Sequence, residues 1–253
     1  MSRTLAILNQ KGGVGKTTTA VNLAAGLALA GQPTLLVDLD PQGNATTALG
    51  LTKSTLEASI YDVLLGECPW AEATVATKVA GLDLLPATLD LANAVVELAT
   101  MEAREHRLLR GLQGAAERYA VIILDTPPSL GLLPINCLVA ADAVLIPMQC
   151  EFFALEGLAQ LEHTMRLIKR GLNPRLEVFG ILLTMMDSRA KLCRDVADAV
   201  RRQYGPRVFA TAIPRTIRLS EAPSYGEAIY TFDPKGKGAQ AYRALTQEVI
   251  ARC

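Results

Sequence analysis

The sequence contains little of what several classes of protein need. Only 5% of its 253 residues are aromatic. No stretch of about 18 or more apolar residues occurs, so the chain offers no candidate membrane span. Its 25 lysines and arginines balance 25 aspartates and glutamates, which argues against a protein that coats nucleic acid by bulk charge. No signal peptide is visible at the start, and we expect a cytoplasmic protein.

Paired cysteines are also missing. The five cysteines are scattered, and none forms a C-x-x-C pair: Cys68, Cys137, Cys150, Cys193 and Cys253. An odd number of isolated cysteines is typical of reduced thiols in a reducing compartment. We therefore interpret them as thiols rather than as disulfides or metal ligands.

Hydrophobic residues, by contrast, make up 50% of the chain. Apolar runs typical of buried strands end in polar or glycine-containing loops, and helical patterns follow them. We predict strands at 4–9, 34–38, 82–85, 121–125, 143–147, 178–184 and 210–213. Helices are expected at 16–30, 102–118, 155–170, 191–204 and 238–252. This alternation predicts one α/β domain over residues 1–253, with a mostly parallel, twisted sheet covered by helices on both faces.

The loop after the first predicted strand has the composition of a phosphate-binding loop. It reads KGGVGKTT from Lys11 to Thr18. The usual pattern, G-x-x-x-x-G-K-[ST], fails at Gln10, and a second lysine, Lys11, stands before the glycines. We expect the backbone N–H groups of Gly12, Gly13, Val14 and Gly15 to bind phosphate oxygens at the start of the following helix.

Three side chains of this loop have separate expected roles. Lys16 would reach the β- and γ-phosphates, Thr17 would bind Mg²⁺, and Thr18 would donate to the α-phosphate. The whole chain is accordingly predicted to be a single P-loop NTPase-like domain. The second lysine, Lys11, is not explained by this ordinary set of contacts.

Acidic residues follow two other predicted strands. Asp125 ends the run VIILD and is expected to hold Mg²⁺ through water, as a Walker B aspartate does. Asp38 and Asp40 end the second strand; we assign Asp40 to positioning the attacking water and Asp38 to supporting Mg²⁺ or Lys16. The alternative for both is capping or turn formation before Pro41.

Basic residues concentrate in one part of the neutral chain. Residues 166–218 contain 12 lysines and arginines but only four acidic residues. Such a segment can give a local basic surface on a neutral protein. The members that we consider for contact with phosphates are Arg189, Lys191, Arg194, Arg201, Arg202, Arg215 and Arg218. For any one of them, a solvated helix face is the alternative.

Together these motifs resemble the deviant Walker A ATPases, and within them the ParA/Soj partition ATPases. The resemblance covers nearly the whole chain. It rests on NQKGGVGKTT at 9–18, DLDPQGN at 38–44, DTPPS at 125–129, IPR at 213–215 and RLSEAPS at 218–224.

The resemblance implies an ATPase that forms an ATP-dependent sandwich dimer with Mg²⁺. In such a dimer, Lys11 would reach the phosphates of the partner's nucleotide, and Asp40 would be needed for hydrolysis. Pro214 and Thr216 would lie near adenine, although Thr216 stands where the family often has asparagine.

The family also implies partners. ATP-bound dimers bind double-stranded DNA without sequence preference, and Arg189 and Arg218 match positions expected to contact it. A ParB-type centromere-binding protein stimulates hydrolysis and releases the DNA, which segregates a chromosome or plasmid. The expected location is the nucleoid.

Two related classes are less consistent with the sequence. A MinD-like ATPase that cycles on a membrane needs a basic amphipathic helix at its C-terminus, but 238–253 has only Arg243 and Arg252 as basic residues. An iron–sulfur relative needs cysteines paired for a shared cluster, which the spacing here does not offer. A nucleotide-binding adaptor without turnover would lack Asp40 or Asp125, and both are present.

Overall fold

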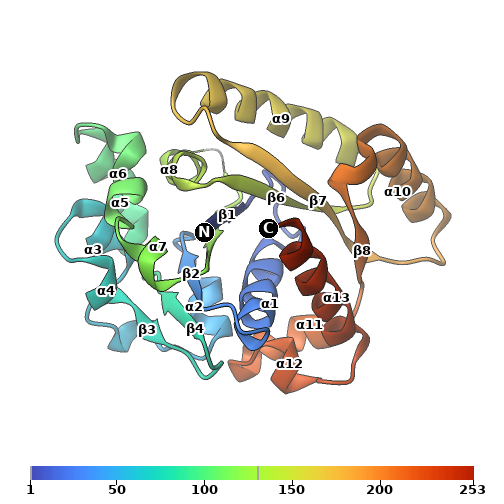
Figure 1. Cartoon of the computed structure of the whole chain (residues 1–253), viewed down its shortest axis with the longest axis horizontal. Coiled ribbons are helices and arrows are strands. Elements are labelled where there is room, and N and C mark those ends of the chain that lie inside the picture. The colour runs from blue at the N-terminus through green and yellow to red at the C-terminus, as the bar shows by residue number, and fades with distance from the viewer. Residues whose placement is uncertain (1, 130) are drawn as a thin grey trace.

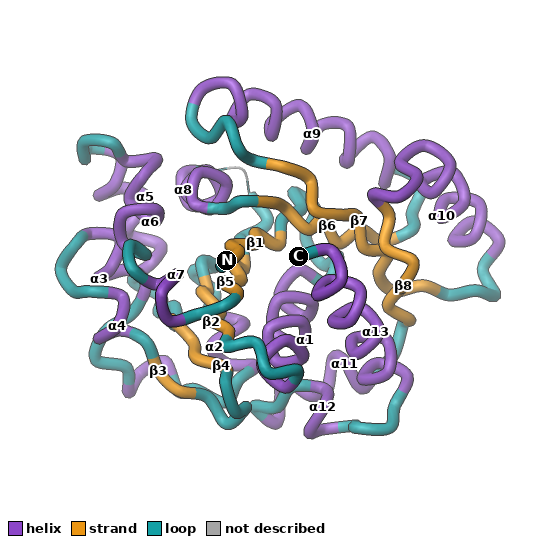
Figure 2. Tube along the Cα trace, in the orientation of Figure 1, coloured by secondary structure: helices purple, strands orange, loops and turns teal. Residues whose placement is uncertain are grey.

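The computed structural model describes residues 2–129 and 131–253, and one eight-stranded sheet runs through them (Figures 1 and 2). The strand order is β3-β4-β2-β5-β1-β6-β7-β8. All neighbours pair in parallel except β3 and β4. The strands are β1 (Arg3–Ile7), β2 (Thr34–Asp38), β3 (Val75–Ala76), β4 (Leu82–Leu85), β5 (Val121–Asp125), β6 (Ala143–Gln149), β7 (Glu177–Met186) and β8 (Val208–Pro214).

Helices cover both faces of this sheet, as predicted. One face carries α1 (Lys16–Leu29), α2 (Asn44–Ala48), α11 (Arg218–Glu221), α12 (Ile229–Phe232) and α13 (Lys237–Arg252). The other carries α3 (Ile60–Leu65), α4 (Trp70–Ala73), α5 (Leu91–Ala99), α6 (Arg107–Gly111), α7 (Ala115–Arg118), α8 (Leu132–Ala140), α9 (Ala154–Gly171) and α10 (Lys191–Tyr204). Short 3-10 turns occur at η1 (Lys53–Thr55), η2 (Arg104–His106), η3 (Gly205–Arg207) and η4 (Ala222–Tyr225).

The two faces divide the hydrophobic core into two layers. In β2, Leu35 and Val37 pack into one cluster while Leu36 packs into the other. Successive side chains of a strand point to opposite faces, so a central strand covered on both sides must be apolar at every position. This explains why β5, and β2 after Thr34, read as unbroken apolar runs up to their terminal aspartates; the predicted bounds of both strands are confirmed.

Elsewhere the predicted bounds need correction. β6 and β7 both extend two residues further at their carboxyl ends than predicted, to Gln149 and Met186. The single helix expected at 102–118 is wrong, because η2, α6 and α7 replace it. Gly114, with φ of 85°, lies in the left-handed region and breaks the helix before α7.

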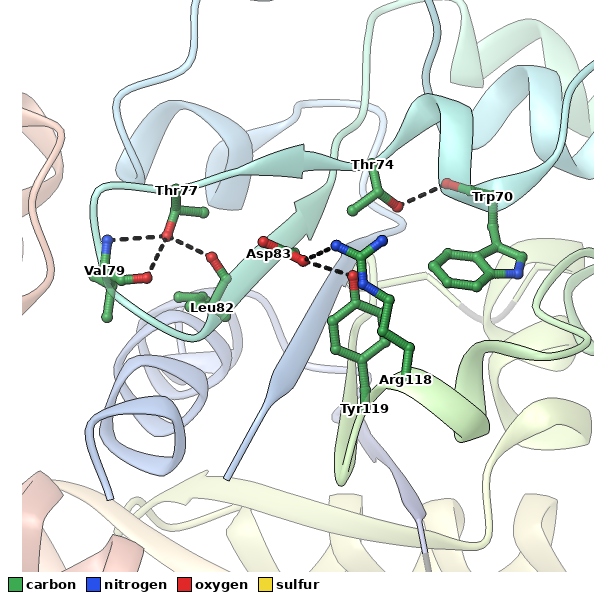
Figure 3. Close-up of polar contacts among 8 residues, drawn as sticks. All are labelled: Trp70, Thr74, Thr77, Val79, Leu82, Asp83, Arg118 and Tyr119. Carbon is green, nitrogen blue, oxygen red and sulfur yellow. Dashed lines mark hydrogen bonds and ion pairs between the residues drawn. The ribbon is translucent and has the colours of Figure 1, made fainter. Parts of the chain in front are cut away.

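The edge strand β3 was not predicted, and a polar network holds it in place (Figure 3). The Thr77 hydroxyl donates to the Leu82 carbonyl at 2.8 Å and accepts from the Val79 N–H at 3.1 Å. Asp83 on β4 accepts from the Tyr119 hydroxyl at 2.7 Å and from the Arg118 guanidinium at 3.0 Å. The β3–β4 hairpin is thereby fixed to the segment that leads into β5.

The parallel strands place their carboxyl ends along one edge of the sheet, which we call the carboxyl edge. Asp38 of β2 is in register with Asp125 of β5. From β1 the chain moves to β2 on one side, and later from β5 to β6 on the other side of β1. Ligands of open α/β sheets bind where the connections change direction in this way.

In the described part of the chain, no helix has the length and apolar character required to cross a membrane.

Candidate functional site

The phosphate-binding loop connects β1 to α1 at the carboxyl edge. Gly13 and Gly15 adopt positive φ angles of 74° and 86°, conformations that a side chain would strain. Asn9 holds the start of the loop: its amide donates to the Pro147 carbonyl at 2.7 Å and accepts from the Lys11 N–H at 3.0 Å. Thr184 holds its middle by donating from its hydroxyl to the Val14 carbonyl at 2.8 Å. The sequence did not single out Asn9 or Thr184.

The two lysines of the loop occupy opposite environments. Lys16 is 7% exposed, and its ammonium donates to the Lys11 carbonyl at 3.0 Å. Burial lowers the pKa of Lys16, against the opposing effect of the Asp125 and Asp40 charges. Lys11 instead extends from the loop with its side chain 54% exposed and forms an ion pair with Glu151, just beyond β6. Lys16 is therefore buried against its own loop, whereas Lys11 extends to the surface.

Asp125 is fully buried, and neither carboxyl oxygen has a hydrogen-bond partner among the described residues. Burial, followed by the neighbouring Asp38 charge, raises the pKa of Asp125 well above its ordinary value. The Thr17 hydroxyl and the Lys16 charge oppose this rise, but a fully buried carboxylate with two acidic neighbours is costly and calls for a further cation. With the Thr17 hydroxyl at the start of α1, this donor set fits Mg²⁺, a hard ion that prefers oxygen ligands.

Asp38 and Asp40 organise the segment that follows β2. Asp38 accepts from the N–H and the hydroxyl of Thr46, both at 2.8 Å, and from the Asp40 N–H at 3.2 Å. Burial raises the pKa of Asp38 to about 6. Asp40, 8% exposed, accepts from the Gln42 N–H at 2.9 Å. The turn contacts that we considered as the alternative are thus present for both residues.

A cavity of about 290 Å³ lies between the phosphate-binding loop and the end of β8. It brings Gly15 and Thr18 of the loop together with Pro214 and Thr216, which are about 200 residues away in the chain. Its wall also includes Thr184, Met185, Ile213, Ile217 and Tyr242. Met185 has a φ of 50°, which is strained for a residue with a side chain. The position of Met185 at the end of a predicted strand could have marked it as a candidate.

The predicted DNA-contact residues lie on neighbouring loops of the carboxyl edge. Arg189 follows β7 and Arg218 begins α11 after β8, and the Arg215 N–H donates to the Met186 carbonyl between these loops at 3.2 Å. Arg189 is 89% exposed and pairs with Asp187 at 3.1 Å. Arg218 is 61% exposed and pairs with Glu221 at 3.0 Å. Exposed pairs of this kind contribute little, so both guanidinium groups remain accessible to phosphates.

The basic segment as a whole is not one surface. Helix α10 begins at the carboxyl edge, and its 14 residues span about 21 Å, so Arg201 and Arg202 lie toward the opposite edge from Lys191 and Arg194. Arg175, between α9 and β7, also lies at that opposite edge. Arg201 and Arg202 are therefore separated from Lys191 and Arg194 along α10, and for them the solvated helix face that we kept as the alternative is the better interpretation.

The fold and the site define a P-loop nucleotide-binding protein with a second lysine in its phosphate loop. A family model described as an AAA domain matches residues 2–178. The sporulation initiation inhibitor protein Soj of Bacillus subtilis is 50% identical over 251 residues, covering 99% of each chain. The chromosome partitioning protein ParA of Myxococcus xanthus is 52% identical over 252 residues, covering 100% of this chain and 89% of its own. The chain belongs to the Soj/ParA family of chromosome-partitioning ATPases.

Among solved structures, a chain described as cobyrinic acid a,c-diamide synthase from Mycobacterium smegmatis has the same fold, with a TM-score of 0.87 and 40% identity. The match covers 99% of this chain and 95% of that one, which was solved with an ATP analogue and magnesium.

Proposed function

We propose that the chain is an ATPase whose two copies close face to face over Mg²⁺ and ATP, bind DNA in that state and release it after hydrolysis. The observation that carries this proposal is the opposite placement of the two lysines. Lys16 is buried against its own loop, while Lys11 extends outward from the same loop. A second lysine that extends outward can form an ion pair with the γ-phosphate of a nucleotide bound in another subunit.

Within each subunit, the residues divide the work as follows. The N–H groups of the glycine loop and the start of α1 bind the phosphates, with Lys16 at the β- and γ-phosphates and Thr18 at the α-phosphate. Thr17 and Asp125 hold Mg²⁺, which neutralises charge that develops on the phosphates. Asp40 orients the attacking water. Asp38 holds this segment in place through Thr46 and supports the metal site indirectly.

Adenine occupies the cavity between the phosphate-binding loop and β8, beside Pro214 and Thr216. The cavity wall combines aliphatic side chains, Ile213, Ile217 and Leu219 among them, with polar groups, and a flat purine ring is a suitable occupant. The relative solved with an ATP analogue and magnesium supports both the nucleotide and the metal.

Lys11 makes assembly depend on the nucleotide. In the free chain it pairs with Glu151, and both side chains are about half exposed. Such a pair stabilises little and can be exchanged for a phosphate across a dimer interface. ATP has a γ-phosphate that the partner's Lys11 can contact, and ADP does not, so dimerisation depends on ATP. The same lysine would stabilise the negative charge that develops during phosphoryl transfer, as an arginine finger does.

DNA is bound by Arg189 and Arg218, which the dimer would present twice. Contacts to phosphates carry no sequence information, so binding is non-specific and strongly dependent on salt. A ParB-type centromere-binding protein stimulates hydrolysis, and repeated cycles on the nucleoid segregate a chromosome or plasmid. The names of the curated relatives support this role.

The alternative is a MinD-like ATPase that cycles on a membrane. That function calls for an amphipathic C-terminal helix that is free to bind lipid. Here α13 lies against the sheet and α1 (Figure 1). It buries Ala239, Tyr242, Leu245 and Val249 in that layer of the core. The apolar side of the helix is thus already used in the core, which favours the DNA-partitioning function.

Sedimentation velocity with Mg²⁺ and either ATP or ADP tests the proposal. The wild type should form dimers with ATP only. Lys11→Ala should bind ATP with nearly unchanged affinity yet stay monomeric, because its lysine acts on the partner's nucleotide. Lys16→Ala, the matched control from the same loop, should lose nucleotide affinity itself. Equal dimer formation by wild type and Lys11→Ala would contradict the proposed role.

A further inference from the structure

Three sulfur atoms meet beneath the carboxyl edge, outside the nucleotide site. Cys150 follows β6, Met186 is the last residue of β7, and Cys193 lies in the first turn of α10. The Cys150 thiol contacts the Met186 sulfur at 3.3 Å, and the Cys193 thiol contacts the same sulfur at 3.6 Å. The sequence interpretation of five isolated thiols did not anticipate this cluster, because 43 residues separate the two cysteines.

The cluster is enclosed but close to the surface. Cys150 is 6% and Cys193 is 8% exposed, whereas Phe152, two residues after Cys150, and Leu192, directly before Cys193, are 75% and 53% exposed. Within the described residues, no group of three His, Cys, Asp or Glu side chains is placed to hold a metal ion. A metal site here would therefore depend on the methionine thioether as its third donor.

Two thiols and a thioether form a soft ligand set. Soft sulfur ligands select monovalent copper and similar ions, whereas Mg²⁺ and Ca²⁺ prefer oxygen. In a planar three-sulfur site with metal–sulfur bonds of about 2.3 Å, the sulfur atoms lie about 4 Å apart, so the cluster would have to open by about half an ångström.

We propose that Cys150, Cys193 and Met186 form a binding site for a soft monovalent metal ion, Cu(I) or Ag(I). Binding displaces the thiol protons to solvent and leaves the oxidation state of the metal unchanged. Burial, followed by the neighbouring Cys193 thiol, raises the pKa of Cys150 to about 12, so its proton must be displaced by the metal.

An occupied site would join three elements that the nucleotide cycle uses. Cys150 immediately precedes Glu151, the ion-pair partner of Lys11. Met186 ends the strand that contributes Thr184 and Met185 to the nucleotide cavity. Cys193 belongs to α10, whose first turns carry Lys191 and Arg194. A bound ion would thus restrain the loop after β6 relative to the start of α10.

The test is an anaerobic titration with Cu(I) against a chromophoric Cu(I) chelator. The protein would carry Cys68→Ser and Cys253→Ser, which remove the two more exposed thiols. One equivalent should bind. Cys193→Ser and Cys150→Ser in this background should each lower the affinity by more than the roughly 100-fold that loss of an outer-shell group costs. Cys137→Ser, a buried thiol outside the cluster, should leave the affinity unchanged.

X-ray absorption at the copper edge provides a second measurement that does not depend on cysteine variants folding well. Three sulfur neighbours at about 2.3 Å are expected in the background protein, and two in Met186→Leu, a substitution of similar volume. Failure to bind one equivalent, equal effects of Cys137→Ser and Cys193→Ser, or an unchanged sulfur number in Met186→Leu would overturn the proposal.

Discussion

At the scale of single residues, the nucleotide site is built from charged groups placed where burial is costly. Asp125 is buried without a hydrogen-bond partner among the described residues, and Lys16 is buried beside it. The attraction between these two charges offsets only part of the cost of burying them, so they weaken the free protein but are ready for ligands of opposite charge. We therefore expect the residues of the site to lower the free energy of unfolding of the free chain and to increase its affinity for Mg²⁺ and ATP.

Asp125→Asn should show this trade directly. We expect the metal-free variant to unfold at higher urea concentration than the wild type, with a gain of about 1–3 kcal/mol, because a neutral amide is less costly to bury than a carboxylate. The same variant should lose Mg²⁺-dependent ATP hydrolysis. Urea unfolding in the presence of a chelator, together with a phosphate-release assay, measures both effects. A less stable variant would show that Asp125 has a stabilising partner that this explanation omits.

Asp38 makes a prediction about pH. Its pKa is raised from 3.8 to about 6 in the folded chain. Between these values the folded state binds the proton more tightly than the unfolded state, so the contribution of Asp38 to stability falls as pH rises from about 4 to about 6. Relative to Asp38→Asn, the metal-free wild type should lose up to about 3 kcal/mol over this range. Urea unfolding of both proteins at several pH values measures the difference, and a difference that stays constant or grows in favour of the wild type would contradict the assignment.

At the scale of elements, the two strands of the β3–β4 hairpin differ: β4 buries Leu82, Leu84 and Leu85, whereas β3 buries little. β3 has only two residues, Val75 half-buried and Ala76 exposed. Asp83 of β4 accepts hydrogen bonds from Arg118 and Tyr119 (Figure 3). The Trp70 ring packs edge-on against the Tyr119 ring, with 5.8 Å between the ring centroids. Loss of this anchor should loosen the hairpin without affecting the nucleotide site on the carboxyl edge.

Tyr119→Phe tests this anchor. Removing the hydroxyl leaves the ring in place but deletes the 2.7 Å hydrogen bond to Asp83, which should cost about 1 kcal/mol. Amide hydrogen exchange in 74–85 should accelerate while ATP affinity stays unchanged. Tyr61→Phe is the matched control, because its hydroxyl bonds to Glu97 in an exposed position and should contribute less. An equal loss of stability in both variants would argue against a special role for the Asp83 network.

At the scale of the whole molecule, the topology of the sheet places basic residues of one sequence segment at two opposite edges. Arg189 and Arg218 lie at the carboxyl edge beside the nucleotide site, whereas Arg175 is exposed at the opposite edge although it belongs to the same basic segment. A dimer that closes over ATP would bring two copies of the first group together. The effect of an arginine substitution on DNA affinity should then depend on the edge at which that arginine lies and not on its place in the sequence.

Charge reversal tests this sorting. Arg189→Glu and Arg218→Glu should each abolish retention of DNA by the ATP-bound dimer but leave ATP-dependent dimerisation intact. Arg189→Ala removes one phosphate contact without reversing the charge. It should lower the slope of log affinity against log salt concentration by the amount expected for about one phosphate per subunit. Arg175→Glu, the control, should bind DNA as the wild type does. DNA binding and sedimentation measure these outcomes, and a defect in Arg175→Glu equal to that in Arg189→Glu would show that overall charge, not position, governs binding.

The sequence alone determined the local features of the protein. Unbroken apolar strands, glycines in the loop and aspartates at strand ends follow from rules that act over a few residues, so β2, β4, β5 and α10 have their predicted bounds. The helix expected at 102–118 failed because its interruption depends on Gly114 and on packing against neighbouring elements. Only the tertiary structure showed that Lys11 pairs with Glu151 and that Pro214 lies beside the phosphate-binding loop. It also showed that the thiols of Cys150 and Cys193 contact the same methionine sulfur. These contacts join segments that are distant in the chain, and it is the order of strands in the sheet that sets which of them meet.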